Sequence, residues 1–571
     1  MHGYFRTRGE IFNNFFLGRH SSSVVPGGDP QYLWPIPLDQ SYWPVNGSSG
    51  QLVSVCGPVA SNQKCFDKTE SSANLRLRLN PEIHISDNLR IMTQLDLLDN
   101  VVLGSTPNSY AMQPSIGSTA GSKVSNTGYS PVQYNGGYAP VNYAPVSFFS
   151  STQGPPTAGI NGWTNSINVN RAWGEYQTPV GQLRFGRMAE HWGLGIVENS
   201  GDGIDSDYQS TIDRIMFITG LKSMDLYFGG AWDFPSTGPT NANPYDVYGG
   251  QPTNTCNLCN VGEWAAFIAH RTNPQTQRLD LSHGDLVVNG GLYALFRSQA
   301  IDLQPGETPS TTNYGAGNNG LEPRQAWAFI PDGWVQALWR KVRFEAEAVT
   351  IQGQIGYLSG LTGANAPVTV RQYGLATQTE YRAVDDTLDL QFGFGWASGD
   401  AFANNAGQGA LQPGTGLQQE YSSGGGPSAI STFRFHPDYR IDLIFWREIM
   451  TRVEGAYYFR PSVDYDFVRS PNGEKLGGGA AFIWSRASEF VQAPGHHRDL
   501  GVEGDLQLYY QSKDGSLNDD PSKIGGFYTM LQYGVFFPLA GLDYLPGQVT
   551  SGFDASLSVA QTIRLFLGIV F

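Results

Sequence analysis

The fold is decided by the last stretch of the chain, RLFLGIVF, which spans residues 564–571. Leu565, Leu567 and Ile569 fall two residues apart, and in a β-strand this spacing places them on one face. Arg564 and Gly568 fall on the other face. An apolar face that runs to a terminal aromatic residue is unusual in soluble proteins, whose last residues normally fray. It is typical of a lipid-facing strand that closes a β-barrel, and a buried strand of a soluble sandwich is the alternative.

The composition of the 571-residue chain favours β-structure with many turns, because 15% of it is charged, 13% is aromatic and 70 residues are glycine. The sequence contains no run of about 18 apolar residues, so it predicts no transmembrane helix. The net charge of −15 argues against nucleic acid as a partner. The first residues contain no basic and apolar leader, so we expect the numbering of an exported protein to start after signal removal.

Alternating segments recur along the chain. In residues 387–398, Leu388, Leu390 and Phe392 share one face, and Asp389 and Gln391 share the other. The same pattern recurs in residues 75–85, 342–349, 499–511 and 523–537. In a closed barrel with lipid outside and water inside, the apolar face of every strand contacts lipid and the polar face contacts water. We therefore predict an all-β fold, a transmembrane antiparallel β-barrel of about 18 strands that spans residues 1–571 as one domain. Sixteen strands is the alternative count.

The connections between these segments alternate in length, as short periplasmic turns and long extracellular loops do in outer-membrane barrels. Long loops are predicted at about residues 18–72, 104–165, 235–261, 300–325 and 399–450. The segment Ile441–Trp446 has the pattern of a strand, but including it makes the strand count odd. Because both termini are expected in the periplasm, the count must be even. We therefore assign this segment to the seventh long loop, where it can fold inward.

Four cysteines form two close pairs, Cys56 with Cys65 and Cys256 with Cys259. Both pairs lie in stretches rich in Gly, Asn and Pro. Two local disulfides in loops fit an oxidising compartment. A zinc site or free thiols are the alternatives, but no histidine lies at ligand spacing from either pair.

Several motifs resemble those of bacterial outer-membrane proteins. RAWGEY (171–176), GQLRFGR (181–187) and WGLG (192–195) look like the strand–turn–strand of porins. DLGVEGD (499–505) with YGVFFP (533–538) is similar to alginate-export-like and other substrate-selective porins. RLNP (78–81), QLDLLDN (94–100), DR (213–214) and FHPDYR (435–440) resemble an uncharacterised deltaproteobacterial (myxobacterial) outer-membrane family. The terminal Phe571 resembles the C-terminal signal of outer-membrane barrels.

This resemblance implies a place in the outer membrane of a Gram-negative bacterium, in contact with outer-membrane lipid and lipopolysaccharide. Porins of this size are often trimers, so a homotrimer is a further expectation.

Charged residues on the inward faces predict a polar lumen. The basic side comprises Arg76, Arg78, Arg90, Arg171 and Arg184, and the acidic side comprises Glu345, Glu347, Asp389, Glu503 and Asp505. By resemblance to general porins, a basic wall opposite an acidic wall would orient polar solutes. Alternatively, these charges neutralise one another and stiffen the barrel. Arg76, Arg78 and Arg90 are the predicted constriction.

One acidic segment could bind a metal ion. Asp202, Asp205 and Asp207 place three carboxylates within six residues, and hard cations prefer several oxygens from one turn. The spacing is not that of an EF-hand, so a solvated acidic loop competes with a calcium site. No other cofactor is expected.

The sequence therefore predicts a porin-like outer-membrane channel for passive diffusion of small polar or charged solutes. A plugged barrel that displays its loops for adhesion or partner binding is the main alternative. An outer-membrane enzyme would need Ser, His and an orienting Asn or Asp together. His191 beside Glu190 is one candidate, but the sequence contains no Gly-x-Ser-x-Gly turn. A soluble multi-sheet protein is a further alternative.

Overall fold

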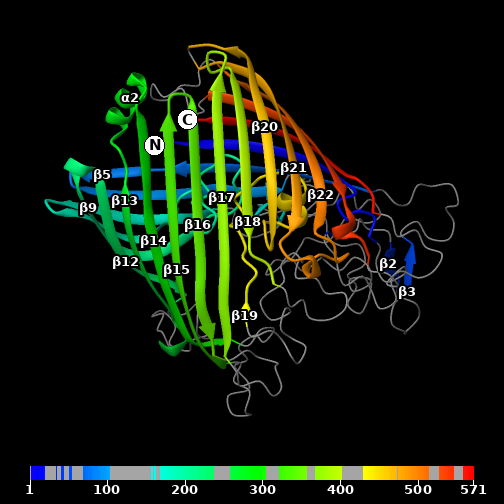
Figure 1. Ribbon diagram of the computed structural model, residues 1–571, viewed down its shortest axis with the longest axis horizontal. Helices are drawn as coiled ribbons and strands as arrows, with labels where there is room; N and C mark the ends of the chain where they lie inside the picture. The colour runs from blue at the N-terminus through cyan, green and yellow to red at the C-terminus, as the bar shows by residue number, and fades with distance from the viewer. Residues whose placement is uncertain are drawn as a thin grey trace, which may run out of the picture.

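The computed structural model describes residues 2–19, 34, 40–43, 51–54, 68–102, 156–157, 160–161, 167–236, 257–303, 321–356, 367–400, 429–471, 473–512, 526–544 and 557–571. Its main feature is one closed antiparallel barrel (Figure 1). The barrel strands are β1 (His2–Asn13), β4 (Thr69–Asn80) with its continuation β5 (Glu82–Ser86), β6 (Leu89–Val102), β9 (Asn168–Thr178), β10 (Gly181–Ala189), β11 (Thr211–Leu221), β12 (Leu226–Ser236), β13 (Val261–His270), β14 (Leu286–Leu303), β15 (Leu321–Trp339), β16 (Val342–Ile355), β17 (Val368–Ala383), β18 (Leu388–Ala397), β20 (Ala456–Arg469), β21 (Lys475–Ala487), β22 (Asp499–Gln511), β23 (Gly526–Pro538) and β24 (Ala560–Val570). With β4 and β5 taken as one strand, the described residues confirm the predicted count of 18.

The first and last strands close the barrel. β1 pairs with β4 on one side and with β24 on the other, so Arg6 lies opposite both Arg76 and Gly568. The backbone groups of Gly3 and Phe571 exchange hydrogen bonds of 2.7 and 3.0 Å. Closure pairs the two strands that would otherwise be exposed edges, as a barrel in hydrocarbon requires.

The predicted period of two is observed directly in β24. Leu565, Leu567 and Ile569 are 43%, 42% and 50% exposed, whereas Arg564 and Phe566 are buried. The exposed residues face outward, where lipid would cover them, and the buried residues face the lumen. The C-terminal strand is therefore a lipid-facing barrel strand.

Most connections at one end of the barrel are short, and most at the other end are longer. Residues 87–88, 179–180, 222–225 and 340–341 are short turns on one side. The two chain termini lie at this short-turn end, near α2 (Pro274–His283) in the β13–β14 turn (Figure 1). The longer connections leave the opposite end. The third of them, residues 190–210, joins β10 to β11, and the seventh, residues 398–455, joins β18 to β20.

Several small elements accompany the barrel. They are the ribbons β2 (Gln40–Trp43) with β3 (Gln51–Ser54) and β7 (Pro156–Thr157) with β8 (Ile160–Asn161), the short β19 (Ala429–Ile430), and the helical turns η3 (Lys222–Met224), η5 (Asn257–Cys259), η6 (Phe445–Ile449), η7 (Phe490–Gln492) and η8 (Ala540–Leu542). β19 pairs in parallel with β17. Among the described residues, no helix is long and apolar enough to cross a membrane.

An apolar core occupies part of the barrel interior. Phe433, Phe445 and Trp446 of the seventh loop are at most 2% exposed. The ring of Phe445 stacks on Phe536 of β23 at 4.8 Å, and the indole of Trp446 donates a 2.8 Å hydrogen bond to Ser485 of β21. The segment Ile441–Trp446 is therefore not a wall strand but part of a loop folded into the barrel, as the sequence analysis placed it.

Two arginine substitutions on β24 test the outward face. Leu565→Arg lies near the middle of the strand and should lower the free energy of unfolding from lipid vesicles by about 2–4 kcal/mol. Ile569→Arg lies near the strand end, where headgroups and water accept the charge, and should cost about 0–1 kcal/mol. Guanidinium titration of the refolded proteins measures both values, and equal costs at the two positions would contradict the assigned membrane depth.

Candidate functional site: two inward loops and a charged lumen

The third loop (190–210) is held inside the barrel by one buried carboxylate. Glu347 of β16 accepts hydrogen bonds from the backbone N–H groups of Leu194, Gly195 and Ile196, the last two at 2.9 and 3.3 Å. Gly193 begins this turn with φ = 56°, and a Cβ atom there would lie 2.5 Å from Glu347 Oε2. A glycine is therefore needed for the backbone to approach the carboxylate this closely.

The seventh loop (398–455) is held by the same device. Glu503 of β22 accepts hydrogen bonds from the N–H groups of Leu443, Ile444 and Phe445 at 2.9, 2.7 and 3.0 Å. Asp442 in turn accepts from the N–H group of Trp446 at 2.9 Å. Two acidic residues predicted to line a pore therefore bind loop backbone.

The two loops also contact each other. The N–H group of His436 donates to the carbonyl of Ile196 at 2.7 Å. Asp438 accepts hydrogen bonds from the hydroxyl of Ser206 at 2.5 Å and from the N–H group of Asp207 at 3.1 Å. These contacts join the third and seventh loops into one assembly inside the barrel.

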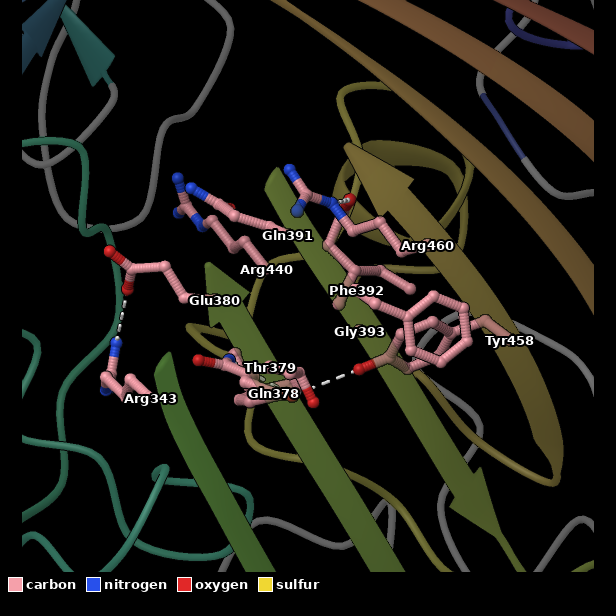
Figure 2. A pocket seen from close by; sticks show the side chains of 12 residues that line it. Arg343, Gln378, Thr379, Glu380, Gln391, Phe392, Gly393, Arg440, Tyr458 and Arg460 are labelled. Carbon is pink, nitrogen blue, oxygen red and sulfur yellow. Dashed lines mark hydrogen bonds and ion pairs between the residues drawn. The ribbon is translucent and has the colours of Figure 1, made fainter. Parts of the chain in front are cut away.

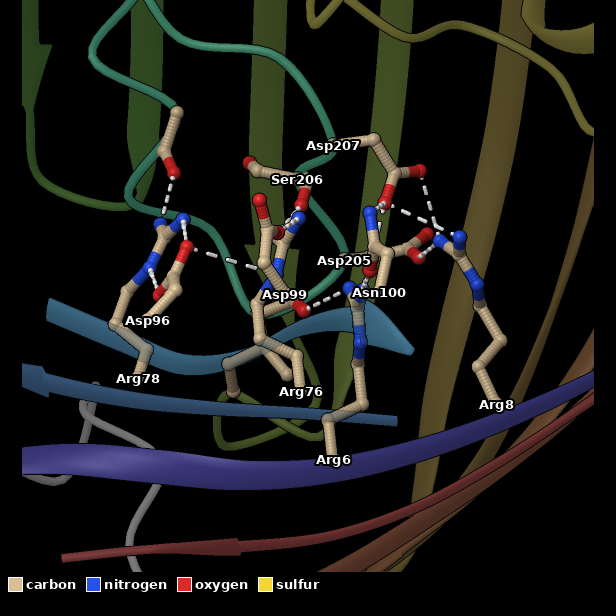
Figure 3. A network of polar contacts seen from close by, with 12 residues as sticks. Arg6, Arg8, Arg76, Arg78, Asp96, Asp99, Asn100, Asp205, Ser206 and Asp207 are labelled. Carbon is tan, nitrogen blue, oxygen red and sulfur yellow. Dashed lines mark hydrogen bonds and ion pairs between the residues drawn. The ribbon is translucent and has the colours of Figure 1, made fainter. Parts of the chain in front are cut away.

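Arginines of β1 reach the acidic segment of the third loop (Figure 3). Arg8 lies 3.0 Å from Asp205 and 2.9 Å from Asp207. Arg6 donates to Asn100 at 2.5 Å and lies 3.4 Å from Asp207. Arg6 and Arg8 were not predicted from the sequence, although both share the inward phase of the first strand.

Arginines of β4 complete the network with aspartates of β6. Arg78 forms a bidentate pair with Asp96, with both N–O distances at 2.8 Å. Arg76 lies 2.9 Å from Asp99 and donates to the carbonyl of Ser206 at 2.6 Å. Both guanidinium groups are buried and paired, so neither is a free charge in the lumen.

The arginines keep the loop carboxylates ionised. Burial alone would raise the pKa of Asp205, but nearby guanidinium groups hold that pKa well below its usual range. These groups belong to Arg447, Arg564, Arg440 and Arg8. The pKa of Asp207 is likewise held well below its usual range. The third loop therefore presents fixed negative charge to a basic wall.

The acidic segment proposed as a calcium site lies within this network. Asp202 pairs with Arg171 of β9 at 2.8 Å, while Asp205 and Asp207 contact the arginines described above. Within the described ranges, no group of three or more His, Cys, Asp or Glu residues is arranged to hold a metal ion. The calcium site stays a prediction, on carboxylates that guanidinium groups already neutralise.

The other predicted lumen residues are spread around the wall. Arg90 is exposed near the short-turn end of β6, and Arg184 lies 3.2 Å from Glu175. Glu345 accepts a 2.7 Å hydrogen bond from the indole of Trp334. The structure therefore does not gather these residues at one constriction, and their pore-lining role stays a prediction.

Two further acidic residues remain on the lumen side of β18 and β22. Asp389 accepts a 2.9 Å hydrogen bond from the amide of Gln391, while Oδ1 of Asp505 is enclosed without a hydrogen-bond partner among the described residues. Cys56, Cys65 and Cys256 lie outside the described residues, as does the side chain of Cys259. The disulfides therefore also stay a prediction.

Three neighbouring cavities line the wall from β16 to β23, and two of them also border the seventh loop. The β17 cavity, about 160 Å³, is lined by Arg343, Glu380, Arg440 and Arg460, among others (Figure 2). The β20 cavity, also about 160 Å³, is lined by Arg460, Ser462, Asp464 and Asp505 among others. The rim cavity, about 390 Å³, is lined by Asp464, Asp466, Arg469 and Tyr509 among others. Shared lining residues place the three cavities side by side, ending at the short-turn rim.

One arginine in these cavities differs from the rest. Arg343 pairs with Glu380 at 3.4 Å, and Arg440 pairs with Asp207 at 2.7 Å. Arg460 donates only to the carbonyl of Ile441, at 2.7 Å, and to the hydroxyl of Ser462, at 3.1 Å. It forms no ion pair with any carboxylate of the described residues. Arg460 was not singled out from the sequence, although it follows the inward phase of β20.

The solved structures that resemble this chain are distant from it in sequence. No protein-family model matches the chain, and no curated protein matches it. Pseudomonas aeruginosa OpdK, solved with vanillate, is 9% identical with a TM-score of 0.40, and the match covers 100% of this chain and 98% of that chain. P. aeruginosa OccK9 (OpdG) is 12% identical with a TM-score of 0.41 over the same shares, and a loop-deletion mutant of Vibrio cholerae OmpT is 7% identical with a TM-score of 0.32, again over 100% and 98%. These low values carry no argument about family or solute.

The class of protein follows from the barrel itself. Eighteen closed strands, an apolar exterior and a polar interior are the features of a porin-like outer-membrane barrel. The chain is therefore an outer-membrane protein of a Gram-negative bacterium.

Hydrogen exchange tests the two loop anchors. Glu503→Ala removes the acceptor of three N–H groups and should speed amide exchange at residues 443–445, because each lost acceptor costs about 1–3 kcal/mol. Glu347→Ala is the matched control and should speed exchange at residues 194–196 instead. Slow exchange at both sites in both variants would contradict the anchoring role.

The contact between the loops should weaken in acid. Burial lowers the pKa of His436 to about 4, because it disfavours the charged ring. The neutral ring accepts a 3.0 Å hydrogen bond from the N–H group of Asp438. Between pH 6.5 and 4 the unfolded chain binds the proton that the folded protein excludes, so stability falls as the pH falls through this window. From pH 7 to 4.5 the expected loss is about 2 kcal/mol after allowance for water around the ring.

Guanidinium unfolding in detergent at pH 7 and pH 4.5 measures this loss. His436→Asn keeps an acceptor but removes the titrating ring, so it should lose about 2 kcal/mol less than the native protein. His283→Asn, at an exposed position of α2, should behave like the native protein. Equal losses in all three proteins would exclude His436 as the source.

Proposed function

We propose that the protein is an outer-membrane channel for passive diffusion of small polar or charged solutes. The observation that carries this proposal is a row of three cavities, two of them bordered by the seventh loop, which reaches the short-turn rim of the barrel. Charged and amide side chains line these cavities, as expected of a path that replaces the hydration of a passing solute.

We further propose that anions are favoured where the β17 and β20 cavities meet. Arg460 lies at this junction as a cation without a carboxylate partner among the described residues. The other arginines that line these cavities form ion pairs with neighbouring carboxylates. A single uncompensated guanidinium group in a narrow polar space attracts anions more strongly than a paired one.

The motifs quoted in the sequence analysis support two finer proposals. The chain would belong to the deltaproteobacterial outer-membrane family that it resembles, and that family would be related to the substrate-selective porins. Lipopolysaccharide around the exterior and a homotrimer are proposals on the same basis.

A plugged barrel is the second candidate function, and one observation favours it. Phe433, Phe435, Phe445 and Trp446 form a dry core inside the barrel, which narrows the space left for solute. Such a barrel would present its long loops to partners or surfaces. Single-channel recording of the detergent-purified protein in a planar bilayer separates the two: stable ohmic steps support the channel, and silence from folded protein supports the plug.

Selectivity under a KCl gradient tests the role of Arg460. Arg460→Gln should raise the permeability of K⁺ relative to Cl⁻ by roughly twofold, because it removes the uncompensated positive charge. Arg187→Gln is the control, since Arg187 faces outward and pairs with Asp213 at 2.8 Å. An unchanged reversal potential in Arg460→Gln would remove Arg460 from the path.

A further inference from the structure

The β20 cavity is lined by opposite charges that form no ion pair with each other. Arg460, Ser462 and Asp464 alternate with outward residues on β20, so all three face the lumen. Four residues of extended strand separate the α-carbons of Arg460 and Asp464 by about 13 Å. The cavity of about 160 Å³ lies between the two charged ends.

Among the described residues, no cation lies within ion-pair distance of the acidic end of this cavity. Asp464 accepts amide hydrogen bonds from Gln507 at 2.6 Å and from Gln391 at 3.4 Å, but it forms no ion pair within the described part of the chain. Asp505 lines the same cavity, and its Oδ1 atom is enclosed without a hydrogen-bond partner there. An enclosed carboxylate oxygen without a donor is costly, so a donor from outside the chain would be stabilised here.

The basic end lacks an anion, because Arg460 contacts only a carbonyl and a hydroxyl group. Elsewhere in the lumen, the opposite charges are paired directly, as between Arg78 and Asp96. The β20 cavity is therefore a place where complementary charges are held apart by a space of molecular size.

We propose that the β20 cavity is a binding subsite for small zwitterions that carry a carboxylate and an ammonium group. The carboxylate is directed to Arg460 and the ammonium group to Asp464 and Asp505. A zwitterion satisfies both ends at once, whereas an anion or a cation satisfies one end and leaves the other unpaired. This inference rests on the proposed channel, because the subsite lies on its path.

Swelling of proteoliposomes tests the proposal with two matched solutes. L-Alanine is a zwitterion, and lactamide has nearly the same shape without charge. The native protein should admit alanine faster than lactamide. Arg460→Gln and Asp464→Asn should each lower this alanine-to-lactamide ratio by roughly tenfold, the order expected for losing one charge-assisted hydrogen bond. Arg187→Gln and Asp213→Asn, on the outer face, should leave the ratio unchanged.

Thermal unfolding in detergent gives a second readout that does not require transport. Alanine should raise the melting temperature of the native protein more than lactamide, and this difference should vanish in Arg460→Gln and Asp464→Asn. If neither solute enters the vesicles but alanine still stabilises the protein specifically, the channel fails and the subsite stands. If both solutes enter equally and stabilise equally, the channel stands and the zwitterion subsite is overturned. A similar rise with acetate alone, or with propylammonium alone, would also overturn it.

Discussion

Backbone N–H and C=O groups must be paired wherever water is excluded, and this one constraint determines both layers of the structure. In the wall, closure of β1 on β24 satisfies it, because each strand then pairs with two neighbours. Inside the barrel, the segments 194–196 and 443–445 of the third and seventh loops belong to no strand. Glu347 and Glu503 satisfy it there by accepting three successive N–H groups each. The wall strands thus carry the acceptors that allow irregular backbone to enter the lumen.

Charge pairing determines where the third loop lies in the lumen. Carboxylates of the third loop meet arginines from β1, β9 and β24, and carboxylates of β6 meet arginines from β4. Buried charges are costly unless they are paired, so these contacts hold the loop against one side of the barrel. The polar cavities lie on the other side, along β16 to β23. The lumen is thus divided into a neutralised side and a side where charges such as Arg460 are still available to a solute.

The sequence predicts the wall better than the contents of the lumen. Alternation of apolar and polar residues in strands such as β18 and β24 indicates both the strand and its outward face, because the period of two is a local property. The same alternation would have placed Arg6, Arg8 and Arg460 on inward faces. It could not show which charges are paired, since Asp205 and Asp207 reach the arginines through a loop that has no period.

For the acidic residues too, the sequence predicts the face on which a side chain lies but not its partner. Glu347 and Glu503 carry the charge and phase of lumen residues, and both do face inward. The partners of Glu347 and Glu503 are backbone groups of segments about 150 and 60 residues away in the chain, respectively, which composition and spacing do not reveal. The motif FHPDYR (435–440) was a usable signal, because His436, Asp438 and Arg440 within it make the contacts between the two loops.

The seventh loop has an apolar face and a polar face, and the two faces bear differently on whether the barrel is plugged or open. Aromatic residues of the seventh loop make a dry core against β21 and β23, and this core cannot conduct polar solutes. The loop face that borders β17 and β20 is polar instead and leaves two cavities there. An apolar anchor on one face and a charged space on the other allow a loop to be rigid and still border a path. Strand β20 fixes the separation of Arg460 and Asp464. A rigid loop beside them limits the water that could reorganise there and screen both charges. The packed core that favours a plug is therefore also the support that a selective path along β20 would require.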